Sequence, residues 1–225
     1  MPLQDRLDAM KADFEAGRFP VKPTPEQLAV MARSTQALID SGQADRALKA
    51  GDKAPAFDLE DSDGRRVGSR ELLARGPLVV SFYRGVWCPY CNLELQALEA
   101  VRPEITARGA ALIAISPQTQ GNSRKSQREN QLSFPILSDV GAKVADAFGI
   151  KYTLSEELVE LYKVFGNDLP RINDDPAWTL PMPARYVIDR NGLIVYAEIN
   201  PDYTHRPDPS ALLPVLDDLR ARSVA

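Results

Sequence analysis

The sequence predicts an α/β protein with a central mixed sheet flanked by helices, preceded by an N-terminal helical extension. From about residue 52 onward, short apolar runs alternate with helical stretches, as in strand–helix–strand units. Near the end of the chain, Asn191-Gly192 separates two apolar runs and predicts a tight hairpin. The last two strands should therefore be antiparallel. Before residue 50, apolar residues fall at helical spacing instead.

Two amphipathic helices are expected at the start of the chain. The first has apolar residues about one turn apart, at Leu3, Leu7, Met10 and Phe14. Thr24-Pro25 supplies a cap and a first-turn proline for the second. We place a boundary near residue 50, which predicts a helical extension over residues 1–49 and a main domain over 50–225. The apolar stripes must bury against the main domain or a partner chain, and the second option predicts a homodimer formed through these helices.

The main domain is expected to contain strands and helices in alternation. The predicted strands lie at residues 57–59, 78–83, 111–116, 134–137, 185–189 and 193–198. Helices are expected at 91–108, 120–131, 140–148, 154–165 and 209–221, with a further short helix between the first two strands. Residues 166–183 are rich in proline and predict a long loop, a kind of segment that often carries function.

Composition and charge exclude several classes of protein. Lys and Arg number 27 against 31 Asp and Glu, so the net charge of −4 makes nucleic acid and anionic membranes poor partners. The longest apolar runs are far below the ~18 residues that span a bilayer. The first residues lack the features of a secretory signal, which predicts a cytoplasmic protein. Two cysteines and one histidine are too few for a zinc finger, and we expect no metal and no other cofactor.

The two cysteines follow the second predicted strand of the main domain, in the stretch Cys88-Pro89-Tyr90-Cys91. Pro89 suits the first turn of the next helix, so Cys88 should be its exposed N-cap and Cys91 should lie in its first turn. Side chains three residues apart on a helix have Cβ atoms ~5–6 Å apart, so small adjustments would let the two sulfurs bond. A helix N-terminus favours a thiolate, and Arg84 is the nearest cation in sequence.

The free energy needed to ionise such a thiol indicates that the helix alone is insufficient. Lowering a thiol pKa from ~8.5 to ~6 requires about 3.4 kcal/mol. A helix terminus supplies at most ~2 kcal/mol, so Arg84 or backbone N–H groups must contribute as well. The cysteine pair predicts thiol–disulfide chemistry. The structural alternative is a packed pair that caps the helix and has no redox role.

Four segments resemble the peroxiredoxin-like branch of the AhpC/TSA antioxidant family. They are Gly51-Asp52-Lys53-Ala54-Pro55-Ala56-Phe57, the run from Phe82 to Leu95, Ala114-Ile115-Ser116-Pro117, and Phe134-Pro135-Ile136-Leu137-Ser138-Asp139. The resemblance covers roughly residues 50–215 and is most specific around the cysteines. It implies a thioredoxin fold and a thiol antioxidant activity against peroxides. The first 45 residues resemble a helical leader that some members carry.

The chain departs from the family pattern at two positions. Peroxiredoxins typically have Thr-x-x-Cys, in which the cysteine is peroxidatic; here that cysteine is Cys91, and Cys88 replaces the threonine. They usually also carry an arginine three residues before the aromatic that opens a Val-Ile-Asp strand. Here Tyr186 is that aromatic and Pro183 takes the arginine's place. Thioredoxin-like oxidoreductases hold a cis-proline there, so the resemblance implies a cis bond before Pro183, facing the cysteines and a bound substrate.

Three functional hypotheses follow. A thiol peroxidase would use Cys91 as the peroxidatic thiolate and Cys88 as the resolving cysteine, with Arg84 or Arg185 polarising the peroxide and a thioredoxin- or glutathione-type reductant closing the cycle. A thioredoxin- or glutaredoxin-like oxidoreductase would instead attack protein or glutathione disulfides with Cys88, and Cys91 would release the mixed disulfide. The third hypothesis is a redox-inert interaction protein that uses its N-terminal helices.

Several other residues are candidates for the site. Trp87 and Tyr83 would wall it and exclude water, although ordinary packing explains them equally well. Glu94 would shuttle a proton or, more simply, complement the charge of the helix N-terminus. His205 is expected in a solvent-exposed loop. The sequence suggests no mechanism for Tyr203 and Arg206, which lie in the same loop.

Overall fold

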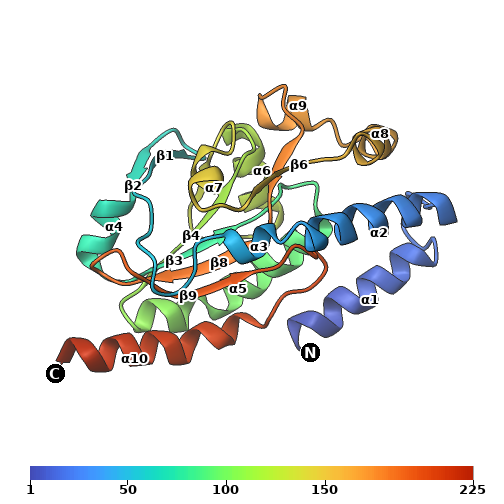
Figure 1. The fold of residues 1–225 in the computed structure, drawn as a ribbon. Coiled ribbons are helices and arrows are strands. Elements are labelled where there is room, and N and C mark those ends of the chain that lie inside the picture. Colours follow the sequence, from blue (N-terminus) through green and yellow to red (C-terminus); the bar gives the residue numbers. More distant parts are fainter. Residues whose placement is uncertain (225) are drawn as a thin grey trace.

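The computed structural model describes residues 1–224, in which seven strands form one mixed sheet (Figure 1). Their order is β2-β1-β5-β4-β3-β8-β9. The bounds are β1 Asp58–Asp61, β2 Arg66–Gly68, β3 Leu78–Phe82, β4 Ala111–Ser116, β5 Ile136–Ser138, β8 Ala184–Ile188 and β9 Ile194–Ile199. The central strand β3 is parallel to β4 and antiparallel to β8. The predicted mixed sheet is confirmed, as is the antiparallel hairpin of β8 and β9.

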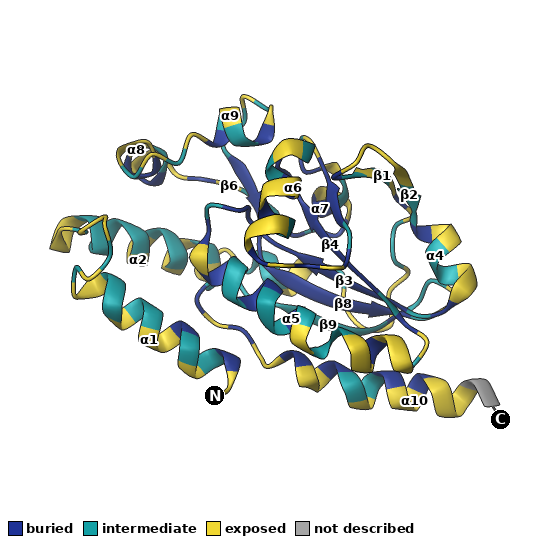
Figure 2. Cartoon of the chain, turned by 180° about the vertical axis from the view of Figure 1, so that it is seen from behind, coloured by how far each residue is buried: buried dark blue, intermediate teal, exposed yellow. Residues whose placement is uncertain are grey.

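Helices cover both faces of the sheet, which is why all five residues of β3 are buried. They are α4 Ser69–Arg75, α5 Pro89–Ala107, α6 Gln120–Glu129, α7 Lys143–Ala147 and α10 Leu212–Val224, the last preceded by the 3₁₀ turn η1 Pro209–Ala211. Side chains alternate along β3. Val79 joins a core with Leu95 of α5 and Leu216 of α10, whereas Val80 packs on the opposite side with Phe148. Figure 2 shows this buried centre between the helical layers.

A second, two-stranded sheet lies beside the main one. It pairs β6 (Lys151–Thr153) with β7 (Thr179–Pro181) in antiparallel register. Between them, α8 (Glu156–Val164) and α9 (Leu169–Asn173) bury a separate apolar cluster. The prediction of one long loop over residues 166–183 was therefore wrong, because that segment contains α9 and β7. Strands of three residues are too short to show a period of two in the sequence.

The N-terminal helices pack onto the rest of the chain. They are α1 (Leu3–Glu15), α2 (Pro25–Asp40) and the short α3 (Gln43–Arg46). Leu3 and Leu7 are buried in the core that α5 shares with the sheet, and α2 contacts α8. Of the two destinations considered for the apolar stripe of α1, the structure shows burial within the chain. The division near residue 50 stays a prediction. Within residues 1–224 no helix has both the length and the hydropathy needed to cross a membrane.

Candidate redox site

The site lies in the loop that joins β3 to α5. Gly85 in this loop has a φ of +151°, and a Cβ on it would come within 2.5 Å of the indole nitrogen of Trp87. Glycine therefore allows the indole to fold back over the loop. The backbone N–H of Val86 donates to Gln118 Oε1 at 2.8 Å, and Asn92 Nδ2 donates to the Val86 carbonyl at 2.9 Å. These bonds fix the loop from both sides.

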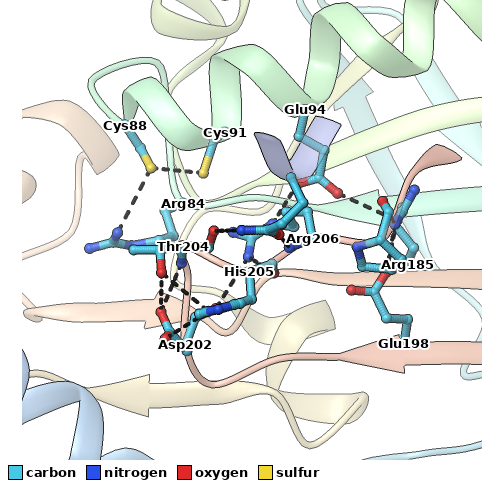
Figure 3. A network of polar contacts seen from close by, with 12 residues as sticks. Arg84, Cys88, Cys91, Glu94, Arg185, Glu198, Asp202, Thr204, His205 and Arg206 are labelled. Carbon is cyan, nitrogen blue, oxygen red and sulfur yellow. Dashed lines mark hydrogen bonds and ion pairs between the residues drawn. The ribbon is translucent and has the colours of Figure 1, made fainter. Parts of the chain in front are cut away.

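The two cysteines begin helix α5 as predicted. Cys88 is the N-cap and Pro89 is the first helical residue, which places Cys91 in the first turn. Both cysteines are free, and the Cys91 thiol donates a hydrogen bond to Cys88 Sγ at 2.9 Å (Figure 3). The expectation of an exposed N-cap thiol was wrong, since Cys88 is only 1% exposed.

Arg84 is a buried cation beside the dithiol. Its Nη1 lies 3.8 Å from Cys88 Sγ, and its Nη2 donates to the hydroxyl of Tyr162. The guanidinium carbon sits 4.0 Å from the ring centre of Tyr203 and 4.8 Å from that of Trp87, within the range of cation–π attraction. The Arg84 charge thus faces aromatic rings and a sulfur, and no carboxylate pairs with it among the described residues.

The surroundings separate the pKa values of the two thiols. Burial raises the pKa of Cys88, but the Cys91 thiol, the Arg84 charge and the Cys91 backbone N–H outweigh it and lower that pKa to about 6. Burial raises the pKa of Cys91 well above its ordinary value, and its hydrogen bond to Cys88 and the Cys88 charge add to this. At neutral pH Cys88 is therefore mainly thiolate, while Cys91 stays protonated as its hydrogen-bond donor.

A cavity of about 260 Å³ reaches Cys88. One side of it comes from the main domain, through Arg84, Trp87, Tyr162 and Tyr203 among others. The other side comes from the N-terminal extension, through residues of α1, α2 and the connection between them, including Phe14 and Phe19. Of the two cysteines, Cys88 lines this cavity and Cys91 does not. Molecules that enter the cavity therefore meet the sulfur with the lower pKa.

A second buried polar cluster lies next to the dithiol (Figure 3). Arg206 Nε is 2.8 Å from Glu94 Oε2, and Arg185 bridges Glu94 and Glu198 at 3.4 and 2.8 Å. Two cations thus face two carboxylates. Glu94 therefore pairs with buried arginines, a role different from both of the roles considered for it from the sequence.

The remaining predicted site residues lie away from the cavity. Arg185 is held by the two carboxylates and by the carbonyl of Pro207, so its side chain is engaged elsewhere. The peptide bond before Pro183 is trans, as are all the others in the described part of the chain, and the expected cis bond was wrong. The Pro183 carbonyl accepts from Asn200 N at 3.2 Å, an intramolecular partner. Tyr83 is fully buried beneath the loop, where its hydroxyl accepts from Gln118.

Sequence reasoning missed several residues that build the site. Tyr162 and Tyr203 enclose the Arg84 guanidinium, and Gln118 holds the loop. Burial raises the pKa of Tyr203, so its phenol stays neutral beside the thiolate. For Phe14 the sequence predicts only a place on the apolar face of the first helix, and gives no sign that its ring lines the cavity. His205 lies in an exposed loop as expected, paired with Asp202 at 2.9 Å.

A thioredoxin-like sheet that presents a dithiol at the start of the helix after its central strand defines a class of thiol-based oxidoreductases. Comparison with known proteins shows to which family within this class the chain belongs. Residues 50–197 match the AhpC/TSA family, and the chain belongs to that family. Its peroxiredoxin relatives support a thiol peroxidase activity.

Individual relatives show how far the likeness extends. Peroxiredoxin Q from chloroplasts of Oryza sativa subsp. japonica is 29% identical over 174 residues, which are 77% of this chain and 68% of that protein. The thiol-disulfide oxidoreductase ResA of Halalkalibacterium halodurans is 36% identical over 110 residues, 48% of this chain and 61% of that protein. Peroxidoxin BcpB of Mycobacterium tuberculosis has a similar structure, with a TM-score of 0.60 at 23% identity over 77% of this chain and 97% of that one. The thioredoxin fold is thereby confirmed.

Proposed function

We propose that the protein reduces peroxides by cycling between the Cys88–Cys91 dithiol and its disulfide, with Cys88 as the attacking sulfur. The observation that carries this proposal is that Cys88 lines the cavity, has a pKa of about 6 and lies 3.8 Å from the Arg84 guanidinium. Family resemblance alone would assign the attack to Cys91. That sulfur is fully buried, and its raised pKa keeps it protonated at neutral pH.

The proposed catalytic cycle has three steps. The Cys88 thiolate attacks the terminal oxygen of ROOH, the O–O bond breaks, and with one proton the products are Cys88 sulfenic acid and ROH. The Cys91 thiol, 2.9 Å away, then attacks the Cys88 sulfur and displaces water, which forms the disulfide. A thiol reductant of the thioredoxin or glutathione class restores both thiols and is itself oxidised to a disulfide. A reducing compartment, for which we propose the cytoplasm, would supply that reductant.

Arg84 is a donor beside the cavity that fits a peroxide. The residue lines the cavity, and its Nη1 lies 3.8 Å from Cys88 Sγ. An oxygen of the peroxide would accept from this guanidinium, and the Arg84 charge would stabilise the alkoxide that leaves.

Trapping of sulfenic acid in single-cysteine variants tests the assignment. The reduced wild type, Cys88→Ser and Cys91→Ser are treated with hydrogen peroxide in the presence of dimedone and analysed by peptide mass spectrometry. We expect Cys91→Ser to accumulate the adduct on Cys88, and Cys88→Ser to form none above untreated protein. An adduct on Cys91 in Cys88→Ser, formed as fast as the wild type is oxidised, would reverse the roles. No oxidation of any form, either by hydrogen peroxide or by cumene hydroperoxide used in its place, would exclude peroxidase activity.

A second candidate function is thiol–disulfide exchange, which the likeness to ResA favours. It would use Cys88 in the same way, with a disulfide in place of the peroxide. Reduction of insulin disulfides in the presence of dithiothreitol, lost in Cys88→Ser, would support it. The covered position of Cys88 favours a small substrate over a protein disulfide.

We also propose that the protein forms a homodimer through its N-terminal helices. The support is α2, which has no buried residue and leaves Ile39 43% exposed. Light scattering of the full chain, compared with Ile39→Glu, tests it: a mass of two chains that falls to one chain in the variant supports the dimer, and a monomeric wild type excludes it.

A further inference from the structure

The N-terminal extension lies outside the residues that match the family, yet it forms part of the cavity at Cys88. Its contributions are almost entirely hydrocarbon: Met10, Phe14, Phe19, Pro20, Val21 and Met31. Hydrogen peroxide has no apolar surface to place against such a wall. A hydroperoxide with an apolar body would gain free energy from the contact.

Phe14 connects the apolar residues of the extension to the main domain through ring contacts. Its ring centre lies 6.0 Å from that of Phe19 and 6.3 Å from that of Phe165, the C-cap of α8, and both pairs are edge-to-face. All three rings line the cavity and are only partly buried. They form an aromatic surface that a ligand can cover.

Cavity size and charge define the class of ligand. An apolar cavity of about 150 Å³ can hold a benzene molecule. The cavity here, at about 260 Å³, has room for one ring with a short branched substituent. Arg84 is its charged lining residue, and it is positioned beside Cys88, where the oxygens would react.

We propose that Phe14 and Phe19 determine substrate specificity, selecting hydroperoxides that carry a ring-sized apolar group over hydrogen peroxide. This inference rests on the peroxidase function proposed above. The apolar body would lie against the aromatic wall, and the hydroperoxide group would point to Cys88 Sγ and the Arg84 guanidinium. The two phenylalanines would act in binding and orientation and take no part in bond breaking.

The test compares two peroxides in four proteins, with Cys88→Ser as the blank for oxidation that does not depend on Cys88. Stopped-flow kinetics measure the second-order rate constants for oxidation of reduced wild type, Phe19→Ala, Phe14→Leu and Val164→Ala by cumene hydroperoxide and by hydrogen peroxide. Phe14→Leu keeps an apolar side chain in α1 and guards against loss of the extension. Val164→Ala is the matched control, because Val164 is 70% exposed on α8 and does not line the cavity.

We expect the wild type to prefer cumene hydroperoxide at least tenfold. Phe19→Ala and Phe14→Leu should lower that preference at least fivefold, with less than a twofold change for hydrogen peroxide, and Val164→Ala should match the wild type. Oxidation by both peroxides at equal rates, or equal losses for both in the phenylalanine variants, would overturn the inference and leave the peroxidase function standing. If neither peroxide oxidises the wild type faster than Cys88→Ser, the proposed function fails and the inference fails with it.

Discussion

The buried arginines near the start of α5 fall into two groups that differ in what neutralises them. Arg84 faces the Cys88 sulfur and three aromatic rings. Arg185 and Arg206 each contact buried carboxylates (Figure 3). Both groups are almost fully excluded from water, so the cost of burying the charge is similar.

The presence or absence of a carboxylate partner decides whether a buried arginine acts on the dithiol or mainly stabilises the fold. A guanidinium paired with a carboxylate has much of its field cancelled, so Arg206 lowers the pKa of Cys88 less than Arg84 does, and it also holds the C-terminal loop on α5. Arg84 lacks such a partner, so its field acts on the Cys88 thiol, whose Sγ lies 3.8 Å from Nη1. Position in the fold assigns the roles more clearly than residue type does.

Replacement of Glu94 by glutamine should give the largest effect, on stability. Its side chain is 3% exposed and contacts both Arg206 and Arg185, so its removal leaves one buried positive charge uncompensated. Breaking a buried pair in this way costs about 3–5 kcal/mol. Urea unfolding should show a loss of that size in the free energy of unfolding. Glu104→Gln, on the exposed side of the same helix, is the control and should cost less than about 1 kcal/mol. Equal losses in the two variants would contradict the comparison.

Replacement of Arg84 by methionine should affect reactivity more than stability. Without the charge the pKa of Cys88 rises from about 6, and each unit above the working pH lowers the thiolate fraction about tenfold. The rate of alkylation by iodoacetamide measures this fraction. In the wild type it should rise with pH through about 6 and then level off, because the thiolate is the form present above the pKa.

In Arg84→Met the midpoint of that profile should move upward, and the alkylation rate at pH 7 should fall about tenfold or more. Arg66→Met removes an exposed arginine and should leave the profile unchanged. A midpoint that stays near 6 in Arg84→Met would mean that the hydrogen bonds from Cys91 and the Arg206 charge lower the pKa of Cys88 without Arg84.

The part of the site that the sequence predicted is the part that local interactions determine. Pro89 at the first helical position and cysteines three residues apart place the dithiol at the start of α5 without reference to the rest of the chain. The β8–β9 hairpin follows in the same way from Asn191-Gly192. Both features can be predicted from the sequence because they depend on backbone geometry over only a few residues.

The rest depends on contacts between residues far apart in the chain. The cavity combines Phe14 of α1, Tyr162 of α8 and Tyr203 of the last loop, and no local pattern brings these together. Arg206 pairs with Glu94 across more than a hundred residues, so its role could be found only from the fold. The burial of Cys88 was likewise not predictable from the local pattern, which predicts an exposed N-cap.

His205 lies next to Arg206, and its replacement by asparagine should have the smallest effect. Its side chain is 53% exposed, and it pairs with Asp202, so water screens the interaction. Exposed pairs contribute less than about 1 kcal/mol, and the free energy of unfolding should fall by no more than that. The rate of oxidation by peroxide should change less than twofold, since His205 lies in an exposed loop and the Arg84 guanidinium is buried. Asparagine keeps a polar side chain in the loop. A larger loss of rate would therefore show that a charge at the surface of this loop influences the Cys88 thiolate. In that case the two groups of arginines would not be electrostatically separate.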